Sequence, residues 1–271
     1  MSERMHVFHP PQSVNGLSPE NIFYVADSAN MTVAEGFITH TYHPYLFPER
    51  PINMFMSIRS KGLGRDMLMG ALLARAQQLR ELTPQLPARL FAQVSPQDSE
   101  GLAFYVDNGF DTVDMLDVVQ LSVPNARPAA PMGYEMGYVP LSTPAESQAF
   151  MQRMNAHRMD AWQPALLARY MSYPHFVALY LSRGPELASE IAFIGEGEAA
   201  KLIGLYVMPN YRRIGLAKIM IAAGMKLLSE KGVTYVEADV IRRNVPQCML
   251  AASCGATFVR TSSCYPGINY D

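Results

Sequence analysis

The sequence predicts an α+β protein built from two copies of one strand-and-helix unit. Three observations support this. One short motif occurs twice, each time between a strand-like apolar segment and a helical segment. A short helix and a strand follow each motif in the same order. The chain has 271 residues, 49% of them hydrophobic, which is ample for two cores. Three prolines mark a linker, so we expect an N-terminal domain at 1–123, a linker at 124–133 and a C-terminal domain at 134–271.

The first half alternates strands with one long helix. Leu68, Leu72, Ala76 and Leu79 recur at helical spacing and predict a helix over 65–81. Apolar segments bounded by turn residues predict the strands, and a further short helix follows. The expected strands are 21–27, 32–42, 52–58, 89–94 and a last strand region over 110–123, and the short helix is 99–108. His6 and His9 precede all of these and are expected in a flexible tail.

The second half has the same order of elements, preceded by two additional helices. A strand is expected around Tyr138, and Pro209 ends the strand before the second motif. The other expected strands are 175–181, 187–195, 201–207, 234–240 and one starting at 257, and the helices are 143–157, 162–171, 218–231 and 245–253. The N-terminal copy therefore lacks the two early helices of the C-terminal copy.

The repeated motif is Arg-x-x-Gly-x-small at the start of a helix. The first copy is Arg59-Ser60-Lys61-Gly62-Leu63-Gly64 and the second is Arg212-Arg213-Ile214-Gly215-Leu216-Ala217. A helix start carries unpaired N–H groups and the positive end of the helix dipole. Glycine has no Cβ, so a ligand can approach the backbone closely. The motif therefore predicts a phosphate site at each helix start.

Composition excludes several classes of protein. The formal net charge is −2 and the pI is about 6.3, so there is no basic footprint for nucleic acid. Cys248, Cys254 and Cys264 have no metal-ligand or redox spacing, so we expect no metal site. Their low, odd number is typical of reduced thiols in a cytoplasm. No signal peptide and no apolar run of membrane-spanning length is present, so we expect a cytoplasmic protein with no membrane partner.

The second motif and its surroundings resemble the GNAT superfamily of acyl-CoA-dependent N-acetyltransferases. The run 205–217 is similar to that family's strand-to-helix segment, and Asn244 matches the Asn that follows its next strand. The family then has a Tyr four residues before Gly-Phe. Tyr105 matches it in the first copy, before Gly109-Phe110, whereas Ala251 takes its place in the second. The resemblance covers most of the chain and implies two tandem GNAT-like domains, each a mixed, mostly antiparallel sheet flanked by helices.

The resemblance implies direct transfer of an acetyl group from acetyl-CoA, a co-substrate, to a primary amine of a small molecule or peptide. It implies no metal. Amides near Val207 would hold the pantetheine arm and polarise the carbonyl, and the helix start would hold the phosphates. The implied coenzyme-binding residues are Leu205, Tyr206, Val207, Arg212, Arg213, Ile214, Gly215, Leu216, Ala217, Lys218 and Asn244, with Arg59, Gly62 and Gly64 in the first copy.

Two residues are the candidates for proton transfer. Tyr105 matches the family's general acid, and the alternative is a packed aromatic side chain. Glu190 lies on a predicted strand and is a candidate base, although the family's glutamate position near Leu202 is not matched. Glu49, in a predicted loop, and the C-terminal Asp271 are weaker candidates for the base. Tyr206 or Tyr265 could replace the missing Tyr of the second copy, and Trp162 could line the acceptor pocket or pack in the core.

Three functions stay open at this point. The first is the N-acetyltransferase, the second a non-catalytic acyl-CoA-binding module or sensor, and the third a structural tandem domain without a ligand. The second copy has the better coenzyme loop and the first has the Tyr, so the sequence favours the second copy for coenzyme binding. Duplicated folds reuse self-complementary surfaces, so we expect a monomer with an internal pseudo-dimer, or a homodimer.

Overall fold

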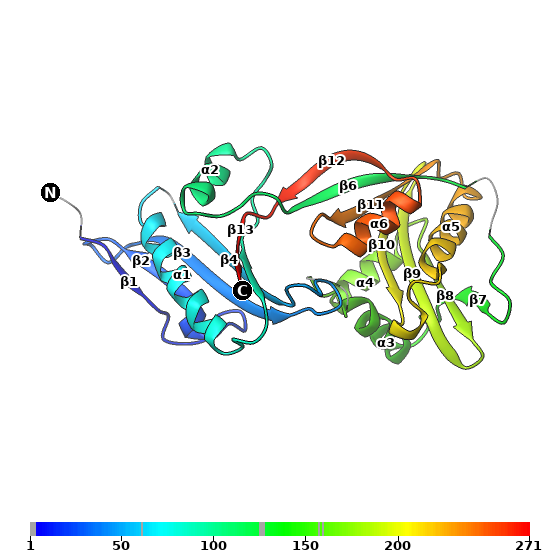
Figure 1. Ribbon diagram of the computed structural model, residues 1–271, viewed down its shortest axis with the longest axis horizontal. Helices are drawn as coiled ribbons and strands as arrows, with labels where there is room; N and C mark the ends of the chain where they lie inside the picture. Colours follow the sequence, from blue (N-terminus) through cyan, green and yellow to red (C-terminus); the bar gives the residue numbers. More distant parts are fainter. Residues whose placement is uncertain (1–3, 61, 125–127, 157, 159) are drawn as a thin grey trace. The chain divides into compact units, whose positions relative to one another are not determined.

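The computed structural model describes residues 4–60, 62–124, 128–156, 158 and 160–271. They form two compact units, Met1–Met115 with Ser263–Asp271, and Leu116–Ser262. Each unit has one mixed sheet with helices against it, which confirms the predicted α+β class (Figure 1). Lys61 of the first motif, residues 125–127 of the predicted linker and His157 at the end of a predicted helix lie outside the described residues.

The N-terminal unit is a six-stranded sheet with one long helix across it. The strand order is β1-β2-β3-β4-β5-β13, and only β4 and β5 pair in parallel. Leu68, Leu72 and Ala76 are fully buried on the long helix, as its periodicity predicts. The elements are β1 His6–Phe8, η1 Pro19–Asn21, β2 Ile22–Ala26, β3 Thr32–Tyr42, β4 Ile52–Ser60, α1 Arg65–Glu81, β5 Ala88–Phe91, α2 Ser99–Asp107 and β13 Gly267–Tyr270.

The C-terminal unit is a seven-stranded sheet covered on both faces. The strand order is β12-β6-β11-β10-β9-β8-β7, with β10 and β11 parallel. The elements are β6 Met115–Ser122, β7 Glu135–Tyr138, α3 Pro144–Asn155, α4 Pro164–Met171, β8 Val177–Arg183, β9 Glu186–Glu196, β10 Ala199–Val207, η2 Pro209–Tyr211, α5 Leu216–Ser229, β11 Tyr235–Ile241, α6 Val245–Ser253 and β12 Thr257–Cys264.

Alternation along β9 assigns the two faces of this sheet. Ile191 and Phe193 pack in one cluster with the buried residues of α5. Ala192, between them, packs in another cluster with Phe150 of α3 and Leu167 of α4. Successive side chains of a strand point to opposite faces, so α5 covers one face and α3 with α4 cover the other.

One strand of each sheet comes from the other half of the chain. β6 follows α2 in sequence, yet it pairs antiparallel with β11 of the C-terminal unit, for example Val119 with Ala238. β13, at the end of the chain, pairs antiparallel with β5 of the N-terminal unit, for example Ile268 with Leu90. The predicted boundaries at 123 and 134 therefore differ from the borders of the two units. A strand pattern indicates a half-buried strand but not which sheet edge it joins.

Arg89 on β5 holds the exchanged strand in the N-terminal sheet. Its side chain is 2% exposed and donates two hydrogen bonds to the carboxylate of Asp111, at 2.7 and 2.9 Å. It also donates to Asn269 Oδ1 on β13, at 2.8 Å, and to the carbonyl of Tyr265. A Cβ at Gly267 would lie 2.7 Å from this guanidinium, so β13 needs a residue without a side chain there.

The N-terminal residues are ordered, so the expected flexible tail is wrong for the residues from His6 onward. β1 pairs with β2, and His9 Nδ1 lies 2.8 Å from the carbonyl oxygen of Ile22. The His9 ring also lies against Phe23, with 4.7 Å between the ring centres. Backbone pairing and this ring contact attach the segment to the sheet edge. Among the described residues, no helix has the length and apolar character needed to span a bilayer.

Candidate coenzyme and active site

The central feature of the C-terminal unit is a separation of two parallel strands. β10 pairs with β11 from Ala199 to Leu202, and no pairing continues beyond that residue. β11 runs on to Ile241 against β6, and β10 runs on to Val207 against β9. A register shift between Leu202 and Gly204 marks the point of separation. In the part of the chain that the structure describes, the carboxyl-terminal half of β10 therefore has one edge without a strand partner.

Alternation of the backbone identifies the groups that face this open edge. The N–H of Met208 donates to the carbonyl of Ala188 in the strand on the other side. Successive residues of a strand direct their backbone groups to opposite edges. Leu205 and Val207 consequently present their N–H and C=O groups to the open edge, whereas Tyr206 is directed toward β9, where Ser189 Oγ donates to its carbonyl at 2.7 Å.

The turn after β10 presents backbone N–H groups at the start of α5. Arg213 has φ 63° and Gly215 has φ 88°, so two residues of this turn are left-handed. Gly215 is the N-cap of α5 and supplies no side-chain hydrogen bond. A turn of this kind exposes N–H groups, and the helix dipole adds positive potential. The start of α5 is therefore open to an anion.

The other helices show how unusual this helix start is. Asp98 caps α2, Thr143 caps α3 and Asn244 caps α6, each through a side-chain oxygen that accepts a backbone N–H. α4 begins without such a bond but has Pro164 at its start. Among the described α-helices, only the two motif helices α1 and α5 begin at a left-handed glycine with no side-chain cap.

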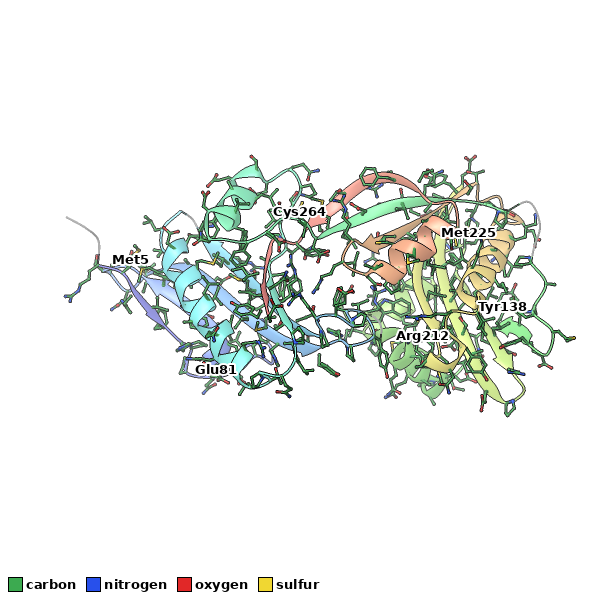
Figure 2. The ribbon with its side chains drawn as sticks, in the orientation of Figure 1. Met5, Glu81, Tyr138, Arg212, Met225 and Cys264 are labelled. Carbon is green, nitrogen blue, oxygen red and sulfur yellow. The ribbon has the colours of Figure 1, made fainter. Side chains whose placement is uncertain are left out.

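The charged side chains of the turn add to its positive potential. Arg212, labelled in Figure 2, donates from Nε to the carbonyl of Val207 at 3.0 Å and so joins the turn to the open edge of β10. Arg213 and Lys218 are exposed. The predicted coenzyme residues 205–207 and 212–218 therefore lie in a single unit, joined by the Arg212–Val207 hydrogen bond, although the Leu216 side chain is buried in the core.

Asn244 has a local role that the sequence does not specify. Its side chain is 8% exposed and accepts a hydrogen bond from the N–H of Gln247 at 3.0 Å, which caps α6. Asp98 accepts a hydrogen bond from the N–H of Gly101 at 2.8 Å in the same way at the start of α2. Asn244 and Asp98 are thus equivalent helix caps in the two units.

The N-terminal unit repeats the strand separation with differences. β4 pairs with β5 only from Ile52 to Phe55 and then continues to Ser60. Gly64 is the left-handed N-cap of α1, with φ 75°. The Ser60 hydroxyl accepts the Gly62 N–H at 3.1 Å, so this turn uses one of its own donors. Arg59 is exposed and lies 3.5 Å from Glu35.

Tyr105 belongs to this N-terminal unit. Its side chain is 5% exposed and lies edge-on against Phe104 and Phe110. Burial raises the pKa of its hydroxyl to about 12, although Arg65 opposes the rise, so the hydroxyl is protonated at neutral pH. The structure therefore does not bring Tyr105 into the same unit as the turn at 212–218. Tyr265 also lies in the N-terminal unit, edge-on against Phe91.

Glu190 is held by an ion pair. It is 2% exposed, and its two carboxylate oxygens accept hydrogen bonds from Arg153 Nε and Nη2 at 2.6 and 2.7 Å. The hydrogen bond to Glu190 raises the pKa of Arg153 further. Both oxygens accept hydrogen bonds from Arg153, so this pair fixes the carboxylate of Glu190 against α3. Glu49 is exposed in the loop between β3 and β4, and Asp271 is bound by Arg50 at 2.7 Å.

The helices α3 and α4 border a groove on the same unit. Its cavity volume is about 520 Å³, and Met151, Trp162 and Leu167 form its buried floor. Trp162 is 3% exposed, and its ring packs against Phe150 and Tyr170. Trp162 therefore packs in the core and also lines this groove, whereas its place in an acceptor pocket stays a prediction.

Comparison with known proteins agrees with this geometry. Residues 147–256 match the model of the Acetyltransferase (GNAT) family. The C-terminal unit contains a GNAT-family acetyltransferase domain. The match extends from α3 to the residue before β12, and it includes the strand separation and the turn at 212–218. It lies wholly in the C-terminal half of the chain.

Solved structures show the same fold over almost the whole chain. A GCN5-related N-acetyltransferase from Sphaerobacter thermophilus is 12% identical, with a TM-score of 0.52, covering 94% of this chain and 82% of that one. Those from Kribbella flavida and Anabaena variabilis are each 10% identical, with a TM-score of 0.54. They cover 98% and 97% of this chain, and 71% and 72% of theirs. A search of curated proteins gave no match.

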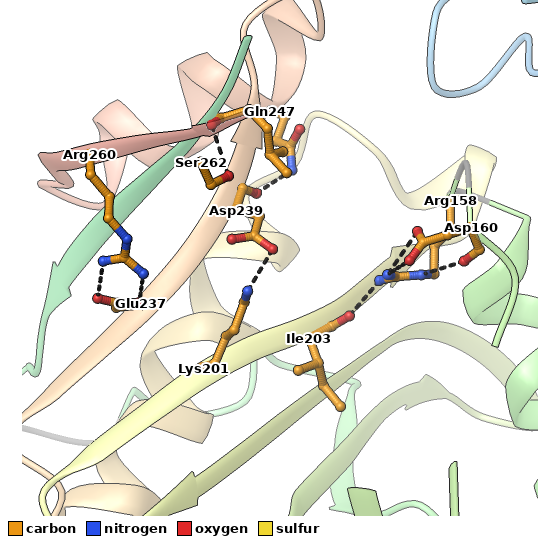
Figure 3. Close-up of polar contacts among 10 residues, drawn as sticks. Arg158, Asp160, Lys201, Ile203, Glu237, Asp239, Gln247, Arg260 and Ser262 are labelled. Atoms are coloured by element: carbon orange, nitrogen blue, oxygen red, sulfur yellow. Dashed lines mark hydrogen bonds and ion pairs between the residues drawn. The ribbon is translucent and has the colours of Figure 1, made fainter. Parts of the chain in front are cut away.

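Arg158 is the residue of this site that sequence reasoning missed. It lies between α3 and α4, and its Nη1 donates to the carbonyl of Ile203 at 2.7 Å, where β10 leaves β11 (Figure 3). Its sequence neighbourhood carries no motif and no periodicity that would single it out. Only the fold brings it to the strand separation.

Proposed function

We propose that the C-terminal unit is an acyl-CoA-dependent N-acetyltransferase that moves an acetyl group from acetyl-CoA to a primary amine of a small molecule or peptide. One observation carries the proposal. The open edge of β10 is followed, after η2, by a helix start that has left-handed residues and no side-chain cap. Such a surface suits a ligand with an amide-bearing arm and a phosphate group.

The residues divide this task between them. The N–H groups of Leu205 and Val207 would hold the arm and stabilise negative charge on the reacting carbonyl oxygen. The amides from Arg212 to Lys218, with the exposed charges of Arg213 and Lys218, would hold the phosphates. Acetyl-CoA supplies the thioester carbonyl. The amide C–N bond forms as the C–S bond breaks, the amine nitrogen loses a proton to water, and the departing thiolate takes one up.

A second candidate function is a non-catalytic acyl-CoA-binding module. Two observations favour it. Ala251 lies on α6 where the family has a Tyr, and it has no proton to donate. Glu190 has both oxygens bound by Arg153. Tyr206 on β10 is the candidate in this unit for replacing the missing Tyr, and its hydroxyl donates to Met208 Sδ at 2.8 Å. In this alternative the coenzyme surface is the same and no thiol is released.

Calorimetry with acetyl-CoA tests the coenzyme surface. Gly215→Glu adds a side chain and a negative charge where the phosphates would lie, and we expect at least a tenfold loss of affinity, about 1.4 kcal/mol. Gly232→Glu is the matched control, because Gly215 and Gly232 are both exposed, both have φ near 90°, and neither has an atom within 4 Å of a built Cβ. Equal affinity of the wild type and Gly215→Glu would refute the proposed surface.

Thiol release separates the two functions. We expect the wild-type protein to release coenzyme A thiol from acetyl-CoA only when a primary amine is added. If acetyl-CoA binds tightly but no amine of a panel causes release of coenzyme A thiol, the function would be that of the non-catalytic binding module.

A further inference from the structure

Arg158 lies at the point where the two parallel strands separate. Its Nη1 donates to the carbonyl of Ile203 at 2.7 Å, and Ile203 lies at the register shift of β10 (Figure 3). The side chain is 24% exposed. A guanidinium has five donors in a planar arrangement, and this bond uses one of them. The remaining donors of Arg158 determine what else the site can bind.

The present partner of Arg158 is a carboxylate that is itself exposed. Nη2 donates to the two carboxylate oxygens of Asp160 at 3.0 and 3.2 Å, and Nε donates to the Asp160 carbonyl at 3.1 Å. The Asp160 side chain is 80% exposed. Glu190, which pairs with Arg153 on the same unit, is 2% exposed instead. An exposed ion pair contributes little, so a ligand carboxylate can displace Asp160 at low cost, whereas Glu190 cannot leave.

The only tryptophan of the chain lies beside this cation. The Trp162 ring centre is 5.2 Å from the Arg158 guanidinium carbon. Two ring atoms would lie 3.2 and 3.4 Å from a Cβ built on Gly204, so the ring covers β10 next to Ile203. The buried indole N–H of Trp162 has no acceptor among the described residues. The site thus combines the Arg158 guanidinium with a buried indole donor on a ring that packs against β10.

The distance along β10 relates this cation to the reacting groups. Ile203 and Leu205 are two residues apart, which corresponds to roughly 6.6 Å of extended strand. An amine must approach the carbonyl carbon to about 3–3.5 Å. A molecule held at Arg158 by a carboxylate can therefore present an amine to a carbonyl held at Leu205 only if few bonds separate its two groups.

We propose that Arg158 binds the carboxylate of the acceptor, so that the acceptor class is amino acids and other short amines that carry a carboxylate. This inference rests on the proposed function, because it names the acceptor of the same site. Arg158 acts here as a specificity-determining residue. Asp160 accepts from Nη2 in the structure, and the acceptor's carboxylate would replace it there.

Trp162 fluorescence tests the binding directly and without turnover. The probes are the twenty standard amino acids and their α-carboxamides, titrated into the full chain. At least one amino acid should change the emission, with its carboxamide at least tenfold weaker. Arg158→Gln should abolish that preference, and Arg169→Gln, which removes an exposed arginine of α4, should keep it. Saturation by carboxamides at the same concentrations, or no response to any amino acid, would overturn the proposal.

Asp160→Asn distinguishes ligand binding from a structural role. It removes the internal competitor, so amino acids should bind more tightly, by up to about fivefold for an exposed ion pair. Weaker binding in Asp160→Asn would mean that the pair only shapes the segment between the helices, and would contradict the proposal. Thiol release measured alongside separates the two claims. Carboxylate-selective binding without thiol release would refute the proposed acetyltransferase function but support the carboxylate site at Arg158. Thiol release with amines that lack a carboxylate, unaffected by Arg158→Gln, would support the acetyltransferase function and refute the carboxylate site at Arg158.

Discussion

Asp111→Ala should destabilise the N-terminal unit specifically, because it removes the main partner of a buried guanidinium. Arg89 is 2% exposed and makes two of its hydrogen bonds to Asp111. Among the described residues, the variant leaves this buried cation with the Asn269 side chain and the Tyr265 carbonyl as its acceptors. Breaking a buried ion pair from one side costs about 3–5 kcal/mol. Asp111 itself is 34% exposed, so water reaches the pair and we expect the lower end, about 3 kcal/mol.

Two probes in one urea titration can assign this loss to a unit. Far-UV circular dichroism reports both units, whereas Trp162 fluorescence reports only the C-terminal unit. We expect Asp111→Ala to shift the circular dichroism transition to lower urea while the Trp162 transition moves much less. Asp107→Ala, at an exposed carboxylate on α2, is the control and should change neither. A shift of Asp111→Ala no larger than this control would refute the role of Arg89 in holding β13.

Two further substitutions test the proton-transfer candidates, and one of them also predicts a pH dependence. Tyr105→Phe should leave thiol release unchanged if the C-terminal unit works as proposed, whereas loss of a general acid would lower kcat about 10²–10⁴-fold. Burial raises the pKa of Tyr105 from 10 to about 12, so its contribution to stability is present below pH 10 and is lost between pH 10 and 12. Tyr105→Phe should therefore make the free energy of unfolding depend less on pH between pH 10 and 12. Glu190→Gln should lower the urea midpoint reported by Trp162 fluorescence, because Glu190 forms an ion pair with Arg153. The pH profile of kcat should not change. A loss of kcat of about 10²-fold or more would indicate that Glu190 is the base after all.

Local patterns predicted the elements of the fold well. The helices at 65–81 and 245–253 have the predicted boundaries, since apolar spacing defines the first and Asn244 caps the start of the second. The strand at 32–42 is also as predicted. These are local properties, because the period of burial and the residues that begin a helix depend on near neighbours.

Strand partners were not predictable in the same way. β6 and β13 each join the sheet of the other half, and nothing in their sequences distinguishes that edge from the edge of their own half. The selecting contacts are remote in sequence. Arg89 and Asn269 are 180 residues apart, and Thr261 donates to Asp117 across 144 residues. Long-range complementarity of this kind leaves no period in the chain.

The candidate site likewise contains residues that local motifs predict and residues that only long-range contacts define. The turn at 212–218 was predicted as a phosphate site because a glycine-bearing helix start is a local motif, and the structure adds that this helix has no side-chain cap. Arg158 could not be found, because its contact with Ile203 spans 45 residues and depends on the separation of β10 from β11. Glu190 was singled out as a base, whereas its pairing with Arg153 becomes visible only once α3 packs on the sheet.

Amide hydrogen exchange with and without acetyl-CoA tests the central claim most directly, because the claim concerns backbone N–H groups. Peptides that cover Leu205–Val207 and Arg212–Lys218 should become protected when acetyl-CoA is added. Peptides that cover residues 55–68 of the N-terminal unit should change much less, since Ser60 already binds one donor of that turn. Protection confined to residues 55–68, with exchange at 205–218 unchanged, would contradict the account.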